Sequence, residues 1–353
     1  MRVALIDVDS KIPNLALMKA SAWHKARGDE VKLYEPLFDN PDLAYASKIF
    51  DFTPDYPYMP DCEVLRGGPG YDRKATLPFP DADRIMPDYE LFGCSYAIGR
   101  MTRGCPNRCP WCIVPSMDGN EVHRVARLTD FWCGQDTVRL LDDNIMADED
   151  VFIDACGELH DAGVKVIWEA LDIRLVTERS AKALKMVRQA KSIHFAWDGH
   201  SQDDAVHEGI EILRAVGLKP WRLMFYVLVG FNTSREYDMY RIKELRRLGA
   251  NPFVMPYDKS DPYQKALARW CNNKFIFKAC PDFDEYEGAR RQGATASRNP
   301  VKDGTIELEV TRNEGATNLR GDGRLRVHRP SDWKVEHDQP RTTERLQPAA
   351  RML

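Results

Sequence analysis

Three closely spaced cysteines are the residues of this chain best suited to chemistry. Cys105, Cys109 and Cys112 form a CxxxCxxC run in TRGCPNRCPWC, and none of the other cysteines, of nine in all, shows comparable spacing. A structural zinc site usually takes four closed ligands, and no second cysteine pair stands near this run. A [4Fe-4S] cluster contains four irons. Three cysteines would hold three irons and leave the fourth open to a ligand with amino and carboxylate groups.

The composition is that of an ordinary water-soluble protein and excludes few partners. The 353 residues are 43% hydrophobic and 29% charged, with a net charge of -4. This charge gives no global attraction to nucleic acid or to an anionic membrane, although local basic patches such as KELRRLG leave an RNA partner open. A chain of this length is expected to hold about two domains.

The chain is expected to be cytoplasmic and without a membrane partner. No apolar run approaches the ~18 residues that a transmembrane helix needs. The first residues, MRVALIDVD, lack the basic, apolar and small-residue order of a signal peptide. In a reducing compartment, an odd number of cysteines favours metal or redox chemistry over a disulfide framework.

Alternating strand-like and helix-like segments follow the cysteine run and must position it. The strand-like segments cover 138–144, 164–174, 192–198, 223–231 and 251–258. Three of the intervening helices are predicted to end at Gly163, Gly217 and Gly249, since glycine readily adopts the left-handed conformation that stops a helix. With a strand before Cys105 the count is six, which indicates a parallel sheet in a partial barrel or a doubly wound fold.

In such folds, functional residues lie at the carboxyl ends of the strands. The cysteine run occupies the loop after the first of these strands. The polar residues at or just past later strand ends are Asp142, Asp143, Asn144, Asp172, Arg174 and Asp198.

The N-terminal segment predicts a small α/β domain. Residues 3–9 read as a buried strand, a helix is expected from Pro13 to Gly28, and a second strand follows at 30–35. Segments 48–52 and 63–72 are expected to be further strand ends opening into loops. The glycines of GGPGY favour a simple turn there over contact with a ligand.

Four regions follow from these patterns. The last is rich in Gly, Arg, Asp, Pro and Thr, and it buries too little apolar surface to offset its ordering entropy, so we expect a disordered tail. The regions are the small α/β domain (1–94), the barrel (95–260), an extension packing on the barrel (261–290) and the tail (291–353).

The run CPNRCPWC, with Trp111 directly before the third cysteine, resembles the cluster-binding loop of radical S-adenosylmethionine (radical SAM) enzymes. The resemblance covers about residues 95–260. It implies a partial (β/α)6 TIM-like barrel, a [4Fe-4S] cluster on Cys105, Cys109 and Cys112, S-adenosylmethionine at the open iron, and an external reductant of the flavodoxin or ferredoxin type. One electron from the cluster would break a sulfonium bond and give a 5'-deoxyadenosyl radical, which abstracts hydrogen from an unknown substrate.

The resemblance implies roles for two further positions near the cofactor's methionine part. Many members carry a Gly-Gly-Glu-like segment that receives the amino group, and LLDDN stands here instead. Asp142 and Asp143 are therefore candidates for the amine, or alternatively caps of the next helix. Arg174 fits the arginine that pairs with the carboxylate, although it could instead form a surface pair with Asp172.

Other cofactor contacts are expected along the remaining strands. By the same resemblance, Glu169 and Asp198 are candidates for the ribose hydroxyls and Trp111 lies beside the cofactor. Gly230 resembles the glycine against which the adenine lies, although glycines at strand ends are common. No residue that would act catalytically is identified by the sequence.

The N-terminal domain resembles the flavodoxin-like, cobalamin-binding domain of one large radical SAM subgroup. The expected DxHxxG run is missing, since the first strand ends in IDVDSKIP and His24 falls within the predicted helix. A vestigial scaffold or a substrate-binding domain is therefore favoured over a cobalamin site.

Several functions stay open at this point. A cobalamin-type radical methyltransferase and an enzyme that modifies RNA or peptides are alternatives within the family. An electron carrier with an iron–sulfur cluster, or a structural metal protein, is the alternative of another class. Cys271 and Cys280 are either ligands of an auxiliary cluster or ordinary buried thiols.

Overall fold

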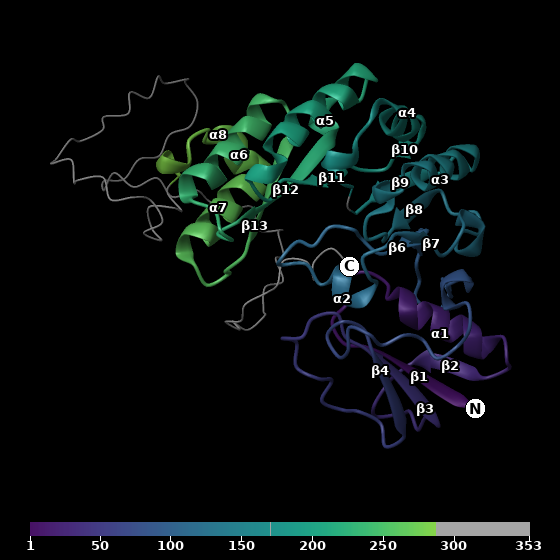
Figure 1. Cartoon of the computed structure of the whole chain (residues 1–353). Coiled ribbons are helices and arrows are strands. Elements are labelled where there is room, and N and C mark those ends of the chain that lie inside the picture. The colour runs from purple at the N-terminus through teal and green to yellow at the C-terminus, as the bar shows by residue number, and fades with distance from the viewer. Residues whose placement is uncertain (170, 287–353) are drawn as a thin grey trace, which may run out of the picture.

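The structure, a computed structural model, describes residues 1–169 and 171–286 and shows a mixed α/β protein with parallel sheets (Figure 1). The predicted tail at 291–353 and the last residues of the predicted extension lie outside this range. In Figure 1 the purple N-terminal sheet lies below the teal and green strands that follow it. None of the described helices is long and apolar enough to cross a membrane.

The N-terminal sheet has four parallel strands in the order β2-β1-β3-β4. Their bounds are Arg2–Asp7 (β1), Glu30–Leu33 (β2), Leu43–Ser47 (β3) and Glu63–Gly67 (β4). The predicted strands at 3–9 and 30–35 are confirmed. Segment 48–52, expected as a strand end, instead follows the end of β3. There the Asp9 carboxylate accepts hydrogen bonds from the backbone N–H groups of Ile49 and Phe50, at 2.7 and 3.0 Å.

Helix α1 (Leu15–Lys25) joins the N-terminal sheet to the rest of the chain. Leu17 packs against the N-terminal sheet, whereas Met18 packs against Ile98 and Leu141. The helix begins at Asn14, whose side chain caps the N–H of Leu17 at 3.2 Å. It therefore has an apolar contact on both sides, and burial of these side chains stabilises the two parts together.

All six strands predicted after residue 94 are present, together with a seventh of two residues at Arg188–Gln189, and their hydrogen bonds are divided between two sheets. The sheet orders are β10-β9-β8-β5 and β11-β12-β13, and every pairing within them is parallel. The strand bounds are Ala97–Gly99 (β5), Thr137–Leu140 (β8), Lys165–Trp168 (β9), Arg188–Gln189 (β10), Ile193–Ala196 (β11), Leu223–Val229 (β12) and Asn251–Pro256 (β13). One backbone hydrogen bond, from Leu171 N–H to His194 O at 2.8 Å, links the end of β9 to β11.

Helices follow most of these strands along the chain and pack against them. Gly163, Gly217 and Gly249 follow three of these helices with φ of 64°, 87° and 79°, so the predicted glycine stops are confirmed. The helices are α3 (Glu149–Asp161), α4 (Glu178–Met186), α5 (Asp203–Ala215), α6 (Arg235–Arg247), α7 (Pro262–Asn272) and α8 (Lys274–Ala279). Single 3₁₀ turns lie at Ala82–Arg84, Leu128–Asp130, Ile145–Ala147, Ile173–Leu175, His200–Gln202, Pro220–Arg222 and Phe283–Glu285.

Side chains alternate between the two faces of each strand. In β8, Val138 and Leu140 are buried in the main apolar core with the helices, whereas Thr137 and Arg139 point to the opposite face. On the same inner side, Arg139 of β8 and Tyr226 of β12 line the larger of the two cavities described below.

Helix α7 belongs to the predicted C-terminal extension and lies against β13. The Asn272 side chain accepts from Val254 N–H at 2.7 Å and donates to Val254 O at 2.9 Å. Cys271 is buried with its thiol on the carbonyl of Pro252, at 3.6 Å. Its position in the core agrees with the structural alternative for this thiol.

Candidate functional site

The cysteine loop is held by a small antiparallel pair of strands. β6 (Thr102–Arg103) enters it and β7 (His123–Arg124) pairs with β6 on the return, with the short helix α2 (Val114–Met117) between them. Gly104 has φ of +88°, and a Cβ there would lie 2.1 Å from the carbonyl oxygen of Glu121. Only glycine fits this entry to the loop.

The three thiols lie close enough together to influence one another. Burial raises the pKa of Cys109 to about 11; nearby Arg174 opposes this rise, while Cys112 and Cys105 add to it. Burial also raises the pKa of Cys112, again with a contribution from Cys105. Without a metal the thiols of Cys109 and Cys112 are protonated near neutral pH, and binding of a metal would release their protons.

A polar atom without a partner lies beside the cysteine loop. Within residues 1–169 and 171–286, no three His, Cys, Asp or Glu side chains converge as they would around one metal ion. The buried Oδ1 of Asn144 has no hydrogen-bond partner among the described residues, and its Nδ2 lies 3.6 Å from Cys105 Sγ. Thus a polar group with an unused acceptor borders the thiols.

Asp172 connects the cysteine loop to the ends of two strands. Its carboxylate accepts from Asn107 of the loop at 2.8 Å and from Asn144, which follows β8, at 3.2 Å. It also accepts from Arg174 Nε at 2.8 Å and Nη2 at 2.7 Å. The Asp172 side chain is 9% exposed and that of Arg174 is 31% exposed, so the carboxylate is largely buried while the guanidinium is partly open to solvent.

Arg174 lies where its positive charge reaches the thiols. It counteracts the raised pKa of Cys109, and the pair with Asp172 fixes its guanidinium through two donors. A guanidinium has five N–H donors, so others are left for a second carboxylate. The pair with Asp172 is thus present beside the cysteines, and the contact of Arg174 with a cofactor carboxylate stays a prediction.

Asp142 and Asp143 accept hydrogen bonds from the backbone at the start of the cysteine loop. Asp142 Oδ1 accepts from Met101 N–H at 3.0 Å, from Thr102 N–H at 2.6 Å and from Thr102 Oγ1 at 2.7 Å. Asp143 Oδ2 accepts from Gly104 N–H at 2.9 Å. Burial raises the pKa of both carboxyls, that of Asp143 to about 6. Their observed partners make them anchors of β6, and the predicted amine contact remains a prediction.

The two residues predicted to contact the ribose, Glu169 and Asp198, lie in different surroundings. Glu169 pairs with Arg139 at 2.5 Å on the inner face of the strands. Asp198 accepts from Leu228 N–H at 3.3 Å, and it contributes to the raised pKa of Cys109 and Cys112. Burial raises the pKa of Asp198 to about 6. Asp198 is therefore near the cysteines, whereas Glu169 already has a cationic partner in the cavity wall.

An aromatic contact beside Gly230 links Trp111 of the cysteine loop to the end of β12 in the sheet β11-β12-β13. The Trp111 ring meets Phe231 edge to face with centroids 5.0 Å apart, and Phe231 meets Tyr257 in the same way at 4.8 Å. Gly230 precedes Phe231 with φ of +79°, and a Cβ there would lie 2.2 Å from the amide nitrogen of Gln264. Glycine is thus required by the chain itself at this position.

A cavity of about 1060 Å³ opens between the N-terminal sheet and the inner face of the later strands. Ser47 at the end of β3 lines one side, and Arg139, Glu169 and Tyr226 line the other. Met117, shortly after the cysteine loop, is also in its wall. A cavity of this size admits a small-molecule ligand.

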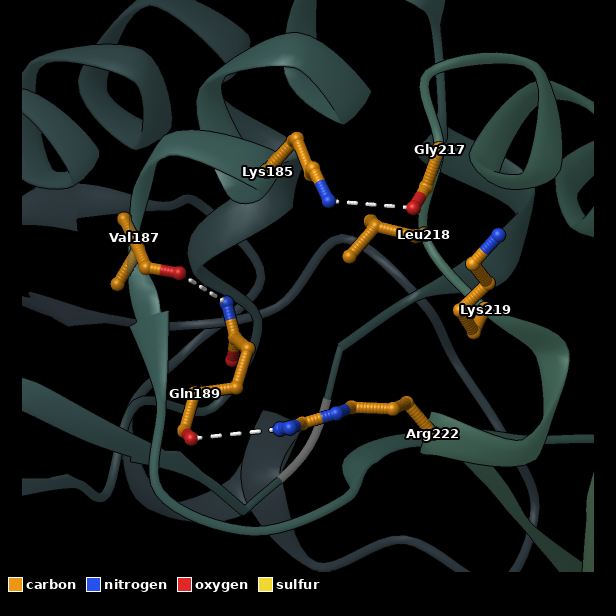
Figure 2. Close-up of a pocket in the computed structure, with 7 residues that line it drawn as sticks. All are labelled: Lys185, Val187, Gln189, Gly217, Leu218, Lys219 and Arg222. Atoms are coloured by element: carbon orange, nitrogen blue, oxygen red, sulfur yellow. Dashed lines mark hydrogen bonds between the residues drawn. The ribbon is translucent and has the colours of Figure 1, made fainter.

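A smaller pocket of about 240 Å³ lies at the opposite, amino-terminal ends of the strands (Figure 2). Lys185 donates to Gly217 O at 3.1 Å and Arg222 donates to Gln189 O at 3.5 Å across it. Arg222 directly precedes β12, so this pocket is remote from the carboxyl ends and from the cysteines.

Three contacts of the site were not predicted as functional. Asn107 lies in a loop whose sequence carries no periodic signal, and Phe231 is the last residue of the predicted segment 223–231. The role of each depends on contacts between distant segments. Arg139 could have been found, since it alternates with Val138 and Leu140 and so must point to the inner face of its strand.

Comparisons with known proteins leave the family open. No family model and no curated protein matches the chain. A solved structure of dihydropteroate synthase from Anaplasma phagocytophilum with bound 6-hydroxymethylpterin-monophosphate is similar over 34% of this chain, at 18% identity and a TM-score of 0.18. The chain spans about 64% of the length of that protein. A likeness at this level carries no argument about fold or activity.

Proposed function

We propose that this protein is a radical SAM enzyme whose cysteine loop holds a [4Fe-4S] cluster at the shared carboxyl end of a divided partial barrel. One pair of contacts carries the proposal. Asn107 bonds to Asp172 beside the first sheet, and Trp111 packs on Phe231 at the end of the second. The loop therefore touches both sheets, which supports one site above both.

The proposal gives roles to the three cysteines of the loop and to residues that lie beside it. Cys105, Cys109 and Cys112 would hold three irons and leave the fourth free for S-adenosylmethionine. When bound there, such a cluster would supply the electron for reductive cleavage of S-adenosylmethionine. Arg174, fixed by Asp172, orients the methionine carboxylate by charge-assisted hydrogen bonds. Asp142 and Asp143 keep β6 in place.

The proposal extends to the cavity, which holds the substrate on the inner face of the strands. The apolar pair of Trp111 and Phe231 shields the cluster side from water, and the polar inner face carries Arg139 and Glu169. The substrate and the reaction that follows hydrogen abstraction are the subject of the next inference and of experiment.

The test is production of 5'-deoxyadenosine from S-adenosylmethionine by reduced, iron-reconstituted protein. Cys109→Ala should abolish it, whereas Cys133→Ala, at an exposed cysteine outside the loop, should retain it. Equal production by both variants would refute the proposal.

A further inference from the structure

The large cavity lies where an open parallel sheet binds ligands. The N-terminal sheet order β2-β1-β3-β4 changes direction at β1 and β3, and ligands bind outside the carboxyl ends of strands at such a switch point. Lys11 follows β1 and Phe50 follows β3, and both line the cavity. The N-terminal sheet thus contributes a binding edge, although its sequence lacks the motif expected for cobalamin.

The charge of the cavity wall is positive. Eight Lys and Arg side chains and five Asp and Glu side chains line it, an excess of three positive charges. Three of the five carboxylates already form ion pairs. Asp83 and Asp118 both pair with Arg103, at 2.8 and 2.6 Å, and Glu169 pairs with Arg139. The two remaining carboxylates accept backbone hydrogen bonds, at Asp9 and Asp72.

Two lysines of the wall form no ion pair with a carboxylate of the described residues. Lys11 and Lys74 have exposed side chains, and no carboxylate of the described residues pairs with either ammonium group. Lys19, 4% exposed, adds a buried amine that donates to Asp83 O at 2.6 Å. An anion entering this cavity would meet uncompensated positive charge, which steers and holds it.

The rest of the wall is apolar and aromatic. Phe50 and Phe52 lie with ring centroids 5.2 Å apart, and Tyr226 and Phe253 meet edge to face at 5.7 Å on the opposite side. Flat apolar groups pack favourably against such rings. A purely ionic ligand would leave this surface unused.

We infer that the cavity binds an organic anion, a molecule with a flat apolar body and at least one negatively charged group, near Lys11 and Lys74. That this anion is the substrate rests on the proposed function. The negative group could be a phosphate or a carboxylate, since both suit lysine ammonium groups.

The experiment uses a matched pair of fluorescent probes on the full-length, metal-free protein. 1-Anilinonaphthalene-8-sulfonate carries a sulfonate, and N-phenyl-1-naphthylamine has the same ring body without it. We expect the double variant Lys11→Glu/Lys74→Glu to weaken binding of the anionic probe about tenfold while the neutral probe changes less than about twofold. Lys265→Glu, at an exposed lysine of α7 outside the cavity, should leave both affinities unchanged.

Three results would overturn the inference: no binding of the anionic probe by the unaltered protein, an equal loss for both probes, or no loss for either. Melting temperatures of the variants check that the fold is kept. The measurement needs neither cluster nor S-adenosylmethionine, so its failure is distinct from failure of cofactor cleavage. Probe binding as expected, without cleavage, would retain the anion site and refute the proposed function.

Discussion

Arg174 and Asp172 form a bidentate ion pair, with Nε–Oδ1 and Nη2–Oδ2 distances of 2.8 and 2.7 Å, and the same carboxylate holds Asn107 of the cysteine loop. One buried carboxylate thus sets the position of the cysteine loop and of the arginine proposed to meet the cofactor. This relationship makes Asp172 a positioning residue, although it touches no thiol itself.

We predict that Asp172→Asn weakens binding of S-adenosylmethionine about tenfold while the cluster is retained. The neutral amide holds Arg174 less firmly, and hydrogen bonds to charged groups contribute about 1.5–3 kcal/mol. Titration calorimetry on anaerobic, cluster-loaded protein measures the affinity. Asp150→Asn removes a carboxylate from an exposed pair with Arg179 and serves as the control. Equal affinities of the Asp172 variant and the unaltered protein would contradict the role given to this pair.

Asp142 is predicted to matter for stability rather than for cofactor contact. It accepts three hydrogen bonds from Met101 and Thr102, and Asp142→Ala would leave those buried donors without a partner. Each unsatisfied buried donor costs about 1–3 kcal/mol, so we expect a loss of roughly 2–4 kcal/mol in the free energy of unfolding. Urea unfolding of the metal-free protein measures it, with exposed Asp161→Ala as the control. A loss below about 0.5 kcal/mol would show that the hydrogen bonds from Met101 and Thr102 to Asp142 contribute little to stability.

The aromatic contact between Trp111 and Phe231 is predicted to protect the cluster. Aromatic pairs contribute about 0.5–1.5 kcal/mol beyond their buried area, so Phe231→Ala should speed removal of iron by a chelator about two- to tenfold. Phe275→Ala, at a side chain that is 87% exposed, is the matched control. The rate is followed by the absorbance of the iron chelate, and identical rates for the two variants would exclude this protection.

The buried amine of Lys19 is predicted to make stability rise with pH. Burial lowers the pKa of Lys19 from 10.5 to about 8, so between these values the unfolded chain binds more protons than the folded one. The free energy of unfolding should therefore increase by about 2 kcal/mol from pH 7.5 to 10, relative to Lys19→Met over the same range. Denaturant unfolding at both pH values gives the difference. Parallel changes in the two proteins would mean that Lys19 titrates normally.

The strands and helix ends were largely predictable because they depend on local pattern. The alternation of strand-like and helix-like runs predicted β8, β9 and β12, and the glycine stops lie where expected because a left-handed residue ends a helix at low cost only if it is glycine. The division into two sheets was not predictable. It depends on the pairing of β10 with β9, and β10 is only two residues long.

The closeness of Cys105, Cys109 and Cys112 was predictable from their spacing, whereas their surroundings were not. Contacts such as Asn107 with Asp172 join segments 65 residues apart, and no short-range pattern encodes them. Strand-end carboxylates illustrate the same limit. Asp142 and Asp198 both follow strands, yet the first faces the backbone of β6 and the second lies near the cysteines.

The open iron is the central claim, and electron paramagnetic resonance of the reduced, reconstituted protein tests it most directly. The account predicts a [4Fe-4S]⁺ signal that changes when S-adenosylmethionine is added, with no signal in a variant carrying Ala at Cys105, Cys109 and Cys112. A cluster signal that does not respond to the cofactor, or a cluster retained by the triple variant, would contradict it.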